Sequence, residues 1–164
     1  MRILLALSFC LLATLALADQ STDSTGDYAM DLGQIYGGVL AVKDMEDICS
    51  EAFPATENAN EVAYEKWRKR FLPFLQEVEK HLSEMAWREA KGDSQRHTEF
   101  LNKMEQSFEG YKNGLRNQMV SDGQNAFRKQ CELYPQYLKT DRTNLENFYA
   151  EQVNTMRRGQ TKKQ

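Results

Sequence analysis

The stretch from Asn58 to Lys91 constrains the fold of this chain more than any other part of the sequence. At about 100° per residue, its apolar side chains fall on one helix face roughly 120° wide. These side chains are Tyr64, Trp67, Phe71, Phe74, Leu75, Val78, Leu82, Met85 and Ala86. A helix of this length spans about 50 Å, so its apolar face needs other helices to cover it. The stretch therefore predicts an all-α bundle of four to five helices around one long central helix.

Pro73 lies inside this stretch, on the side opposite the apolar face. A proline removes one backbone hydrogen bond and bends a helix toward the core. We therefore expect a kink near Lys69 to Pro73 rather than a break. Asn58, with Glu61 three residues later, resembles a capping box with asparagine as the cap, so the long helix is expected to begin there.

Residues 1–18 have the pattern of a secretory signal peptide. Arg2 supplies a positive charge, the run from Ile3 to Leu15 is almost wholly apolar, and Ala16-Leu17-Ala18 fits the cleavage rule. The apolar run is too short to span a bilayer comfortably, so no stable membrane anchor is expected after cleavage. Residues 19–27 contain no apolar side chain and are expected to form a disordered leader. The pattern predicts an exported protein, in the bacterial periplasm or outside the cell.

Cleavage after Ala18 would leave one domain and two cysteines. The remaining 146 residues carry 20 basic and 24 acidic side chains, a net charge of −4, which argues against a nucleic-acid partner. Cys10 leaves with the signal peptide, and Cys49 and Cys131 are expected to form a single disulfide in an oxidising compartment. Closing a loop of about 80 residues stabilises a fold by roughly 4 kcal/mol on the chain-entropy model. The end of the first helix is therefore expected to lie beside the fourth.

The segment from Tyr28 to Phe53 has a helical pattern interrupted by glycines. Gly33, Gly37 and Gly38 each cost about 1 kcal/mol inside a helix. We favour an irregular start followed by a firm helix from about Val39 to Glu51. The alternative is that the glycines allow a neighbouring segment to approach the backbone closely.

Three further helices are expected after Gly92. The third runs from the Asp93-Ser94 cap to about Val120, with Phe100, Leu101, Met104, Phe108, Tyr111, Leu115 and Met119 on one face. A capping box from Ser121 to Gln124 begins the fourth, which is expected to end before Tyr134-Pro135. The last helix is expected to begin at Thr143. Residues 28–158 would form the helical bundle domain, and residues 159–164 a basic tail.

Histidine chemistry is the main route by which this chain could be an enzyme or a metal protein. The sequence has two histidines, and His81 has Glu77 and Glu84 one turn away on either side. A helical metal site needs such ligands on two helices, so the favoured interpretation is a boundary histidine with acidic neighbours. No phosphate loop, nucleophile elbow or paired-cysteine metal motif is present. The sequence predicts no catalytic residues, no metal and no cofactor.

A basic segment surrounds two of the aromatic residues of the long stretch. Lys66, Arg68, Lys69 and Arg70 lie beside Trp67 and Phe71, and Trp87 falls outside the apolar face. These cations point in different directions around a helix, so a solvated rim is favoured over a grip on an anionic partner. Trp87 and the four cations are nevertheless the candidate partner surface.

The function predicted from these features is that of a small exported helical protein that binds another protein without catalysis. Inhibitors, immunity proteins and periplasmic accessory factors are examples of that class. The signal ending Ala-Leu-Ala-Asp and the Cys-Ser-Glu-Ala-Phe-Pro segment, with a second cysteine about eighty residues later, are similar to those of small exported bacterial proteins. That resemblance transfers no functional residue. One alternative is a carrier of an apolar small molecule in the bundle interior, in a closed pocket lined by Phe, Met and Tyr. A second is a metal protein or enzyme centred on His81.

Overall fold

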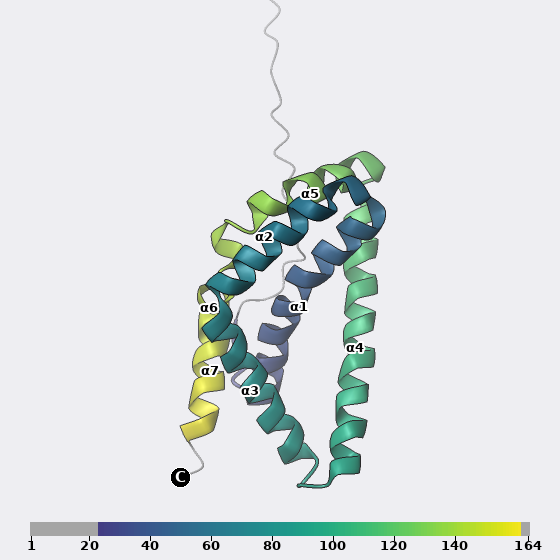
Figure 1. Ribbon diagram of the computed structural model, residues 1–164. Helices are drawn as coiled ribbons and strands as arrows, with labels where there is room; N and C mark the ends of the chain where they lie inside the picture. The colour runs from purple at the N-terminus through teal and green to yellow at the C-terminus, as the bar shows by residue number, and fades with distance from the viewer. Residues whose placement is uncertain (1–22, 162–164) are drawn as a thin grey trace, which may run out of the picture.

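The computed structural model describes residues 23–161, which form helices and no strand (Figure 1). The expected signal peptide with Cys10, and the end of the basic tail, lie outside the described residues. The helices are α1 (Tyr28–Ala52), α2 (Glu57–Arg70), α3 (Leu72–Glu89), α4 (Ser94–Ser121), α5 (Gln124–Tyr137), α6 (Leu145–Phe148) and α7 (Ala150–Thr161), with short 3₁₀ turns η1 (Pro54–Thr56) and η2 (Asp141–Thr143). The all-α prediction is confirmed. None of the described helices is long and apolar enough to cross a membrane.

The central helix of the fold is α1, and not the long stretch that follows it. Asp27 caps its first turn by accepting a hydrogen bond from the Met30 backbone N–H at 2.9 Å. Within the segment expected to be a disordered leader, Thr25 is hydrogen-bonded to Asp31 at 2.8 Å, which fixes the chain before this cap. α1 contacts each of the other six helices. It therefore supplies the axis around which the bundle is built.

α1 runs through its glycines without interruption, so the expected irregular start before Val39 was wrong. A Cβ atom on Gly38 would lie 2.6 Å from Cε2 of Tyr149, which is closer than side chains approach. At Gly33 and Gly37 a Cβ atom would meet nothing within 4 Å. The alternative interpretation, close approach of a neighbour, therefore applies at Gly38 alone. Burial of the helix outweighs the unfavourable helix propensity of glycine at the other two positions.

A pair of alanine substitutions separates these roles of glycine. Gly38→Ala is expected to lower the free energy of unfolding by about 1–3 kcal/mol, because the added methyl group would overlap the buried Tyr149 ring. Gly37→Ala adds the same methyl group to the same helix in open space, and is expected to raise the free energy of unfolding by up to about 1 kcal/mol. Urea unfolding of both variants measures the difference. Equal effects of the two substitutions would contradict the close contact.

The expected single kinked helix from Asn58 to Lys91 is not confirmed, because the chain forms two helices that meet at Phe71. Phe71 has φ −101° and ψ 10°, outside the helical region, and the chain changes direction between α2 and α3 (Figure 1). Pro73 lies in the first turn of α3, where its missing N–H leaves no helical hydrogen bond unmade. Asn58 is not a cap, since α2 already begins at Glu57 directly after η1.

The ends of the later helices match only some of the ends predicted from the sequence. Asp93 caps α4 as expected, with its side chain accepting from the Arg96 N–H at 2.9 Å. The capping box expected at Ser121 does not form, because that hydroxyl donates to the Gln118 carbonyl oxygen at 2.7 Å instead. α5 continues past its expected end and contains Pro135 in its last turn. The expected last helix is divided at Tyr149, and Asn144 caps its first part.

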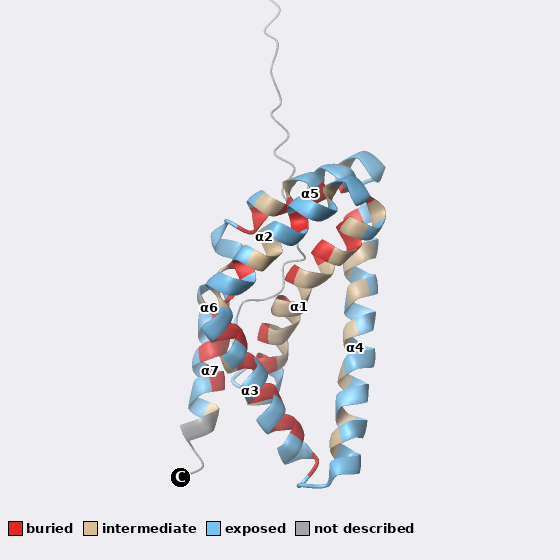
Figure 2. Cartoon of the chain, viewed as in Figure 1, coloured by how far each residue is buried: buried red, intermediate tan, exposed pale blue. Residues whose placement is uncertain are grey.

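The predicted disulfide between Cys49 and Cys131 is confirmed and joins α1 to α5. The two Cα atoms are 5.2 Å apart, and both residues are fully buried. Figure 2 shows buried residues on α1, α3, α5 and α7, and the last three helices each contact α1. α4 differs from the others, because its residues are mostly exposed or half-buried along its whole length. The core is therefore concentrated on one side of α1, and α4 covers the other side incompletely.

Candidate functional site

The apolar face of α4 is only partly covered by the rest of the protein. Of the seven apolar residues expected on this face, Met119 alone is buried. Leu101 is 40% exposed and Tyr111 is 65% exposed, whereas Phe108 reaches α1 and meets Tyr36 edge to face at 5.0 Å between ring centroids. A helix of 28 residues with so little buried surface contributes little to the core. Its exposed apolar side chains therefore mark a candidate interaction surface.

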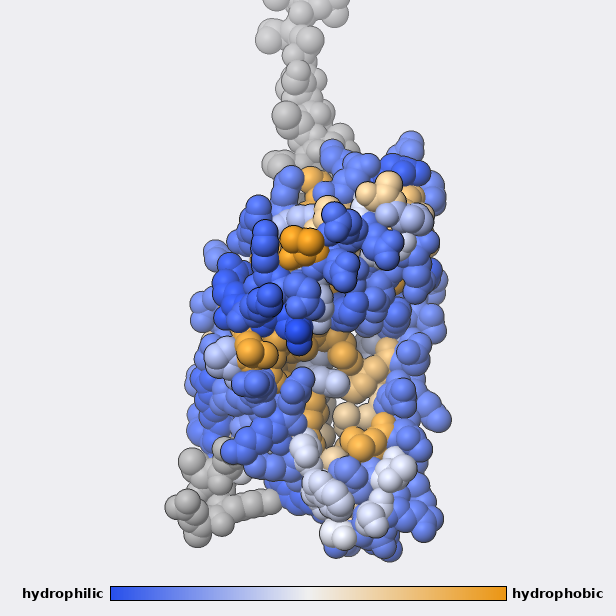
Figure 3. Space-filling model, in the orientation of Figure 1, coloured by the Kyte–Doolittle hydropathy of each residue, from blue (hydrophilic) through white to orange (hydrophobic). Residues whose placement is uncertain are grey.

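A surface hollow of about 380 Å³ lies between α1 and α4, and we call it the α1/α4 groove. Its lining residues are Tyr36, Leu40 and Asp44 from α1 and Leu101, Met104, Glu105, Phe108, Glu109 and Lys112 from α4. In the space-filling view, apolar surface is visible in a hollow between α3 and α4 (Figure 3). The groove is open to solvent and so differs from the closed interior pocket expected for a carrier. Its volume lies at the lower end of the range of about 300–1,000 Å³ for ligand sites.

Three acidic side chains and one lysine, Lys112, form the charged part of the α1/α4 groove. The Asp44 carboxylate forms no hydrogen bond or ion pair with the described residues, and burial raises its pKa, while the neighbouring Lys112 acts in the opposite direction. Glu109 and Asp47 also raise the pKa of Asp44. The nearby Lys112 is 3.5 Å from Asp47. The groove thus presents a partly desolvated carboxylate that a cation would stabilise.

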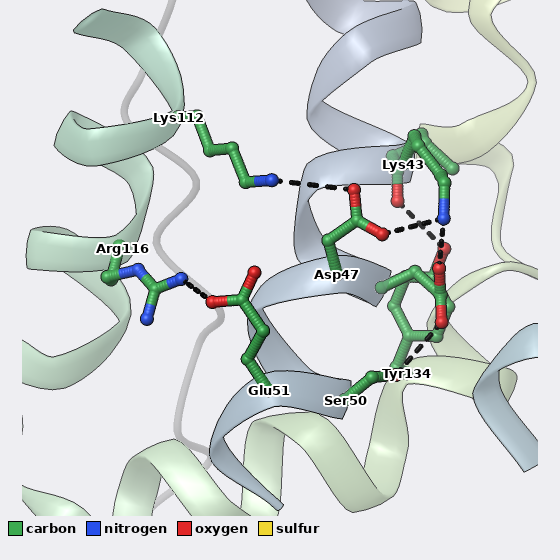
Figure 4. A network of polar contacts seen from close by, with 9 residues as sticks. Lys43, Asp47, Ser50, Glu51, Lys112, Arg116 and Tyr134 are labelled. Carbon is green, nitrogen blue, oxygen red and sulfur yellow. Dashed lines mark hydrogen bonds and ion pairs between the residues drawn. The ribbon is translucent and has the colours of Figure 1, made fainter. Parts of the chain in front are cut away.

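Ion pairs hold the C-terminal half of α4 against α1 (Figure 4). Arg116 pairs with Glu51, and Lys112 with Asp47, which is also 2.7 Å from Lys43. On the other side of α1, the Tyr134 hydroxyl donates to the Val42 carbonyl oxygen at 2.8 Å. These contacts fix α4 at one end only. The α1/α4 groove extends along α4 from Leu101 to Lys112, the first of the two α4 residues in these pairs.

A second hollow, of about 310 Å³, lies between α2 and α5, and we call it the α2/α5 groove. Its lining residues are Ala59, Val62, Ala63, Lys66, Trp67, Arg70, Pro135, Leu138 and Lys139. It contains two of the four predicted partner cations, Lys66 and Arg70. Arg68 pairs instead with Glu65 at 3.2 Å, and Lys69 is exposed outside the groove.

Lys139 is a lining residue that the sequence analysis did not identify. It follows α5, which brings it across from α2 only in the folded chain. The i, i+4 spacing of Lys66 and Arg70 was the signal in the sequence that these two share one helix face. No signal in the sequence related Lys139 to them.

Trp87 lies in the last turn of α3, at the far end of that helix from Arg70 and from the α2/α5 groove. It is 45% exposed, and its ring stacks on His97 with centroids 3.9 Å apart and planes at 14°. It lines neither groove. The residues chosen as one candidate partner surface thus occupy separate places in the fold.

His81 is buried in α3 and its acidic neighbours are engaged elsewhere. Its Nδ1 is 3.0 Å from the Tyr28 hydroxyl. Glu77 accepts two hydrogen bonds from Arg157, at 2.8 and 2.7 Å, and Glu84 is 3.9 Å from Lys80. Among residues 23–161, no three His, Cys, Asp or Glu side chains are grouped so that they could hold a metal ion. The structure therefore gives the metal site at His81 no support.

The buried state of His81 predicts how stability depends on pH. Burial lowers the pKa of His81, while Glu77 and Glu84 oppose that shift. As pH falls below about 6.5, the unfolded chain takes up the proton first. The stability due to neutral His81 is thus complete above that pH, and it is lost as pH falls through the lower pKa of the folded protein.

As the pH is lowered from about 7.5 to 5.5, we expect the melting temperature of the wild type to decrease, and that of His81→Gln to decrease less. Thermal unfolding followed by circular dichroism measures both slopes. His97→Gln makes the same change at the other histidine, which contacts the exposed Trp87, and serves as the control substitution. If His81→Gln kept the wild-type slope, a titrating role for His81 would be excluded.

Comparison with known proteins does not extend this description, since no protein-family model, curated protein or solved structure matches the chain. Within residues 23–161, the chain is an all-α fold joined by the Cys49–Cys131 disulfide, and two of its surface hollows are the mainly acidic α1/α4 groove and the basic α2/α5 groove.

Proposed function

We propose that this chain is an exported, non-catalytic protein-binding factor of the inhibitor, immunity or periplasmic accessory type. Its binding site is the α1/α4 groove. The observation that carries the proposal is the exposed apolar face of α4 beside that groove. On this proposal, the bundle has four to five principal helices, and the partner completes the layer that α4 leaves open.

The partner segment that fits this groove is an amphipathic helix. The apolar lining residues Leu101, Met104 and Phe108 follow a helical spacing along α4, so they present a straight apolar edge opposite Tyr36 and Leu40. A helix laid along such an edge buries apolar side chains at its own i, i+3 and i+4 positions. Exposed apolar surface between two helices is the kind of surface that helix-in-groove recognition covers.

Charge complementarity indicates that the partner helix is basic. Asp44, Glu105 and Glu109 border the groove, and Asp44 is partly desolvated without an ion-pair partner. A lysine or arginine beside the apolar anchors of the partner would satisfy that carboxylate. The net charge of −3 for the whole chain would also raise the rate at which a basic partner associates.

Export is supported by the disulfide, because cysteine pairs persist mainly in oxidising compartments. The signal-peptide pattern of residues 1–18 adds sequence support to the same proposal. On this proposal, cleavage before Asp19 releases a protein with no stable membrane anchor. N-terminal sequencing of the exported protein tests the cleavage point directly.

The proposed site is tested with Met104→Lys, which places a cation in the groove, and Met30→Lys as its matched control. Met30 is 60% exposed at the start of α1 and lines neither groove. The probes are two synthetic amphipathic helices, one of leucine and lysine and one of leucine and glutamate, with binding followed by fluorescence anisotropy. We expect the lysine helix to bind the wild type and Met30→Lys, and to bind Met104→Lys at least about tenfold more weakly. The glutamate helix is expected not to bind.

The natural partner is then identified by photo-cross-linking from position Leu101 in an extract of the source cell envelope. Support requires a partner whose cross-linked peptide is a basic amphipathic helix, and whose capture is lost with Met104→Lys and kept with Met30→Lys. Cross-linking only to a second copy of the chain would replace the proposal with self-association. Equal binding of both synthetic helices to both variants would reject the groove as the site.

A carrier of an apolar small molecule is the second candidate function. The open α1/α4 groove, in place of the closed interior pocket first expected, would hold the molecule, because the groove has ligand size and a lining of Tyr36, Leu40, Met104 and Phe108. It predicts that the neutral fluorophore N-phenyl-1-naphthylamine binds the wild type and is displaced by lipids extracted from the source cells. Binding should be lost in Met104→Lys. Absence of fluorophore binding to the wild type would exclude this candidate.

A further inference from the structure

The α2/α5 groove is apolar at one end and cationic at the other. Ala59, Val62 and Ala63 line it along the first half of α2, and Val62 is 46% exposed. Lys66 and Arg70 follow on the same side of that helix, and Lys139 approaches from the end of α5. In the space-filling view, a small apolar patch enclosed by hydrophilic surface lies over α2 (Figure 3).

The charge of this groove is not neutralised within the described part of the chain. The side chains of Lys66 and Lys139 form no ion pair or hydrogen bond with residues 23–159. Arg70 donates one hydrogen bond to the Leu138 carbonyl oxygen at 3.2 Å and lies over the Phe71 ring, which leaves it without a carboxylate partner there. Three cations at one end of an apolar hollow form an anion-binding arrangement.

The floor of the groove is held in place by buried contacts. Trp67 is 3% exposed, and its indole N–H donates to the Thr143 carbonyl oxygen at 2.8 Å. The same ring contacts Tyr64 and Phe71. The bond between Arg70 and Leu138 joins the end of α2 to the end of α5. The hollow is therefore formed before any ligand binds, which favours binding of a small molecule.

We infer that the α2/α5 groove binds an anionic single-chain amphiphile of the fatty-acid type. The carboxylate lies among Lys66, Arg70 and Lys139, and the hydrocarbon chain lies over Ala59, Val62 and Ala63. The volume of about 310 Å³ lies within the range of small-molecule sites. This site is separate from the α1/α4 groove and does not depend on the proposed partner.

The test is isothermal titration calorimetry of the whole folded chain with dodecanoate, below its micelle concentration. The variant is Lys66→Glu with Lys139→Glu, which reverses two cations of the groove. Its control is Lys69→Glu with Lys129→Glu, which makes the same change of net charge on exposed residues of α2 and α5 outside the groove. We expect dodecanoate to bind the groove variant at least about tenfold more weakly than the wild type, and the control within about twofold.

Two further probes distinguish the contributions of the head and the chain. Acetate supplies the carboxylate without a chain and is not expected to bind detectably. Dodecyltrimethylammonium supplies the chain with a cationic head, and its binding is expected to be no weaker in the groove variant than in the wild type, because the reversed charges oppose only an anionic head. Val62→Asn, at the apolar end, is expected to weaken dodecanoate binding several-fold while Lys66 and Lys139 are unchanged. Circular dichroism confirms that each variant is folded.

Three results would overturn the inference. They are no binding of dodecanoate to the wild type, equal binding of dodecanoate to the groove variant and its control, and a loss of ammonium amphiphile binding in the groove variant as large as the loss of dodecanoate binding. Loss of dodecanoate binding in Met104→Lys with full binding in Lys66→Glu and Lys139→Glu would assign the amphiphile to the α1/α4 groove instead. That result would reject this site and leave the test of the proposed function unaffected.

Discussion

Replacing Cys49 and Cys131 together with alanine is expected to lower the melting temperature by about 10–15 °C. The disulfide closes a loop with a sequence separation of 82 residues, and the chain-entropy model assigns such a loop roughly 4 kcal/mol. Alanine is preferred to serine because both positions are fully buried, and a hydroxyl there would be left without a partner. Differential scanning calorimetry of wild type and variant measures the change.

Reduction provides the matched control for this prediction. A thiol reductant should lower the melting temperature of the wild type toward that of the double variant, once local opening exposes the buried sulfurs. The same reductant should leave the double variant unchanged, since no other disulfide is present among the described residues. A double variant as stable as the oxidised wild type would mean that packing of α1 on α5, and not the covalent bond, maintains this contact.

Trp67→Ala is expected to lower the free energy of unfolding by about 3–5 kcal/mol. The indole is buried, stacks beside Tyr64 and Phe71, and donates its N–H to the Thr143 carbonyl oxygen. Its removal leaves a cavity and a buried carbonyl group that has lost a donor. Thr143 lies 76 residues further along the chain. The substitution therefore also removes a hydrogen bond that links α2 to the segment before α6. Urea unfolding measures the loss.

Trp87→Ala is the matched control, because it removes the only other tryptophan in the chain. Trp87 is 45% exposed and contacts His97 at the turn between α3 and α4, so we expect a loss of no more than about 1 kcal/mol. Trp67→Phe fills most of the space and removes only the hydrogen bond, with an expected loss of about 1 kcal/mol. Equal losses from Trp67→Ala and Trp87→Ala would contradict the placement of Trp67 in the core.

The helical pattern of the sequence predicted which residues the core would contain better than it predicted where helices begin and end. Phe74, Leu75, Val78, Leu82 and Met85 are all buried on one face of α3, as expected. Apolar periodicity reports burial directly, because a helix face that packs must be apolar along its length. The boundaries depend on single turns, where several local interactions of similar strength compete. At Ser121, for example, a hydrogen bond back to Gln118 replaced the expected capping box.

The division of the long stretch at Phe71 has a tertiary cause. Pro73 allows either a bent continuous helix or a new helix that begins just before it. Trp67 packs toward Thr143, whereas Phe74 and the residues after it belong to the apolar face of α3. Two helices in different directions satisfy both contacts. The sequence contains the proline, but it does not contain the positions of the neighbours that choose between the two conformations.

Only some residues of each candidate site could be predicted from the sequence. Lys66 and Arg70 were recognised as cations beside apolar residues, yet their common groove requires α5 to bring Lys139 and Leu138 across from them. The α1/α4 groove was missed because the apolar face of α4 has the same pattern whether it is covered or exposed. A periodic pattern states which side of a helix is apolar, and it does not state whether the fold provides enough neighbours to cover that side.

The sequence by itself determined that this protein is all-helical and which helix faces are apolar. It also determined that Cys49 and Cys131 are available to join the first expected helix to the fourth. These properties follow from the helical repeat and from residue chemistry, which act locally along the chain. Only the tertiary structure decided that α1 is the centre, that Gly38 admits Tyr149, and that α4 is left partly uncovered. Those outcomes depend on the relative positions of helices that are distant in sequence, because each apolar face is buried only where another helix has room to meet it.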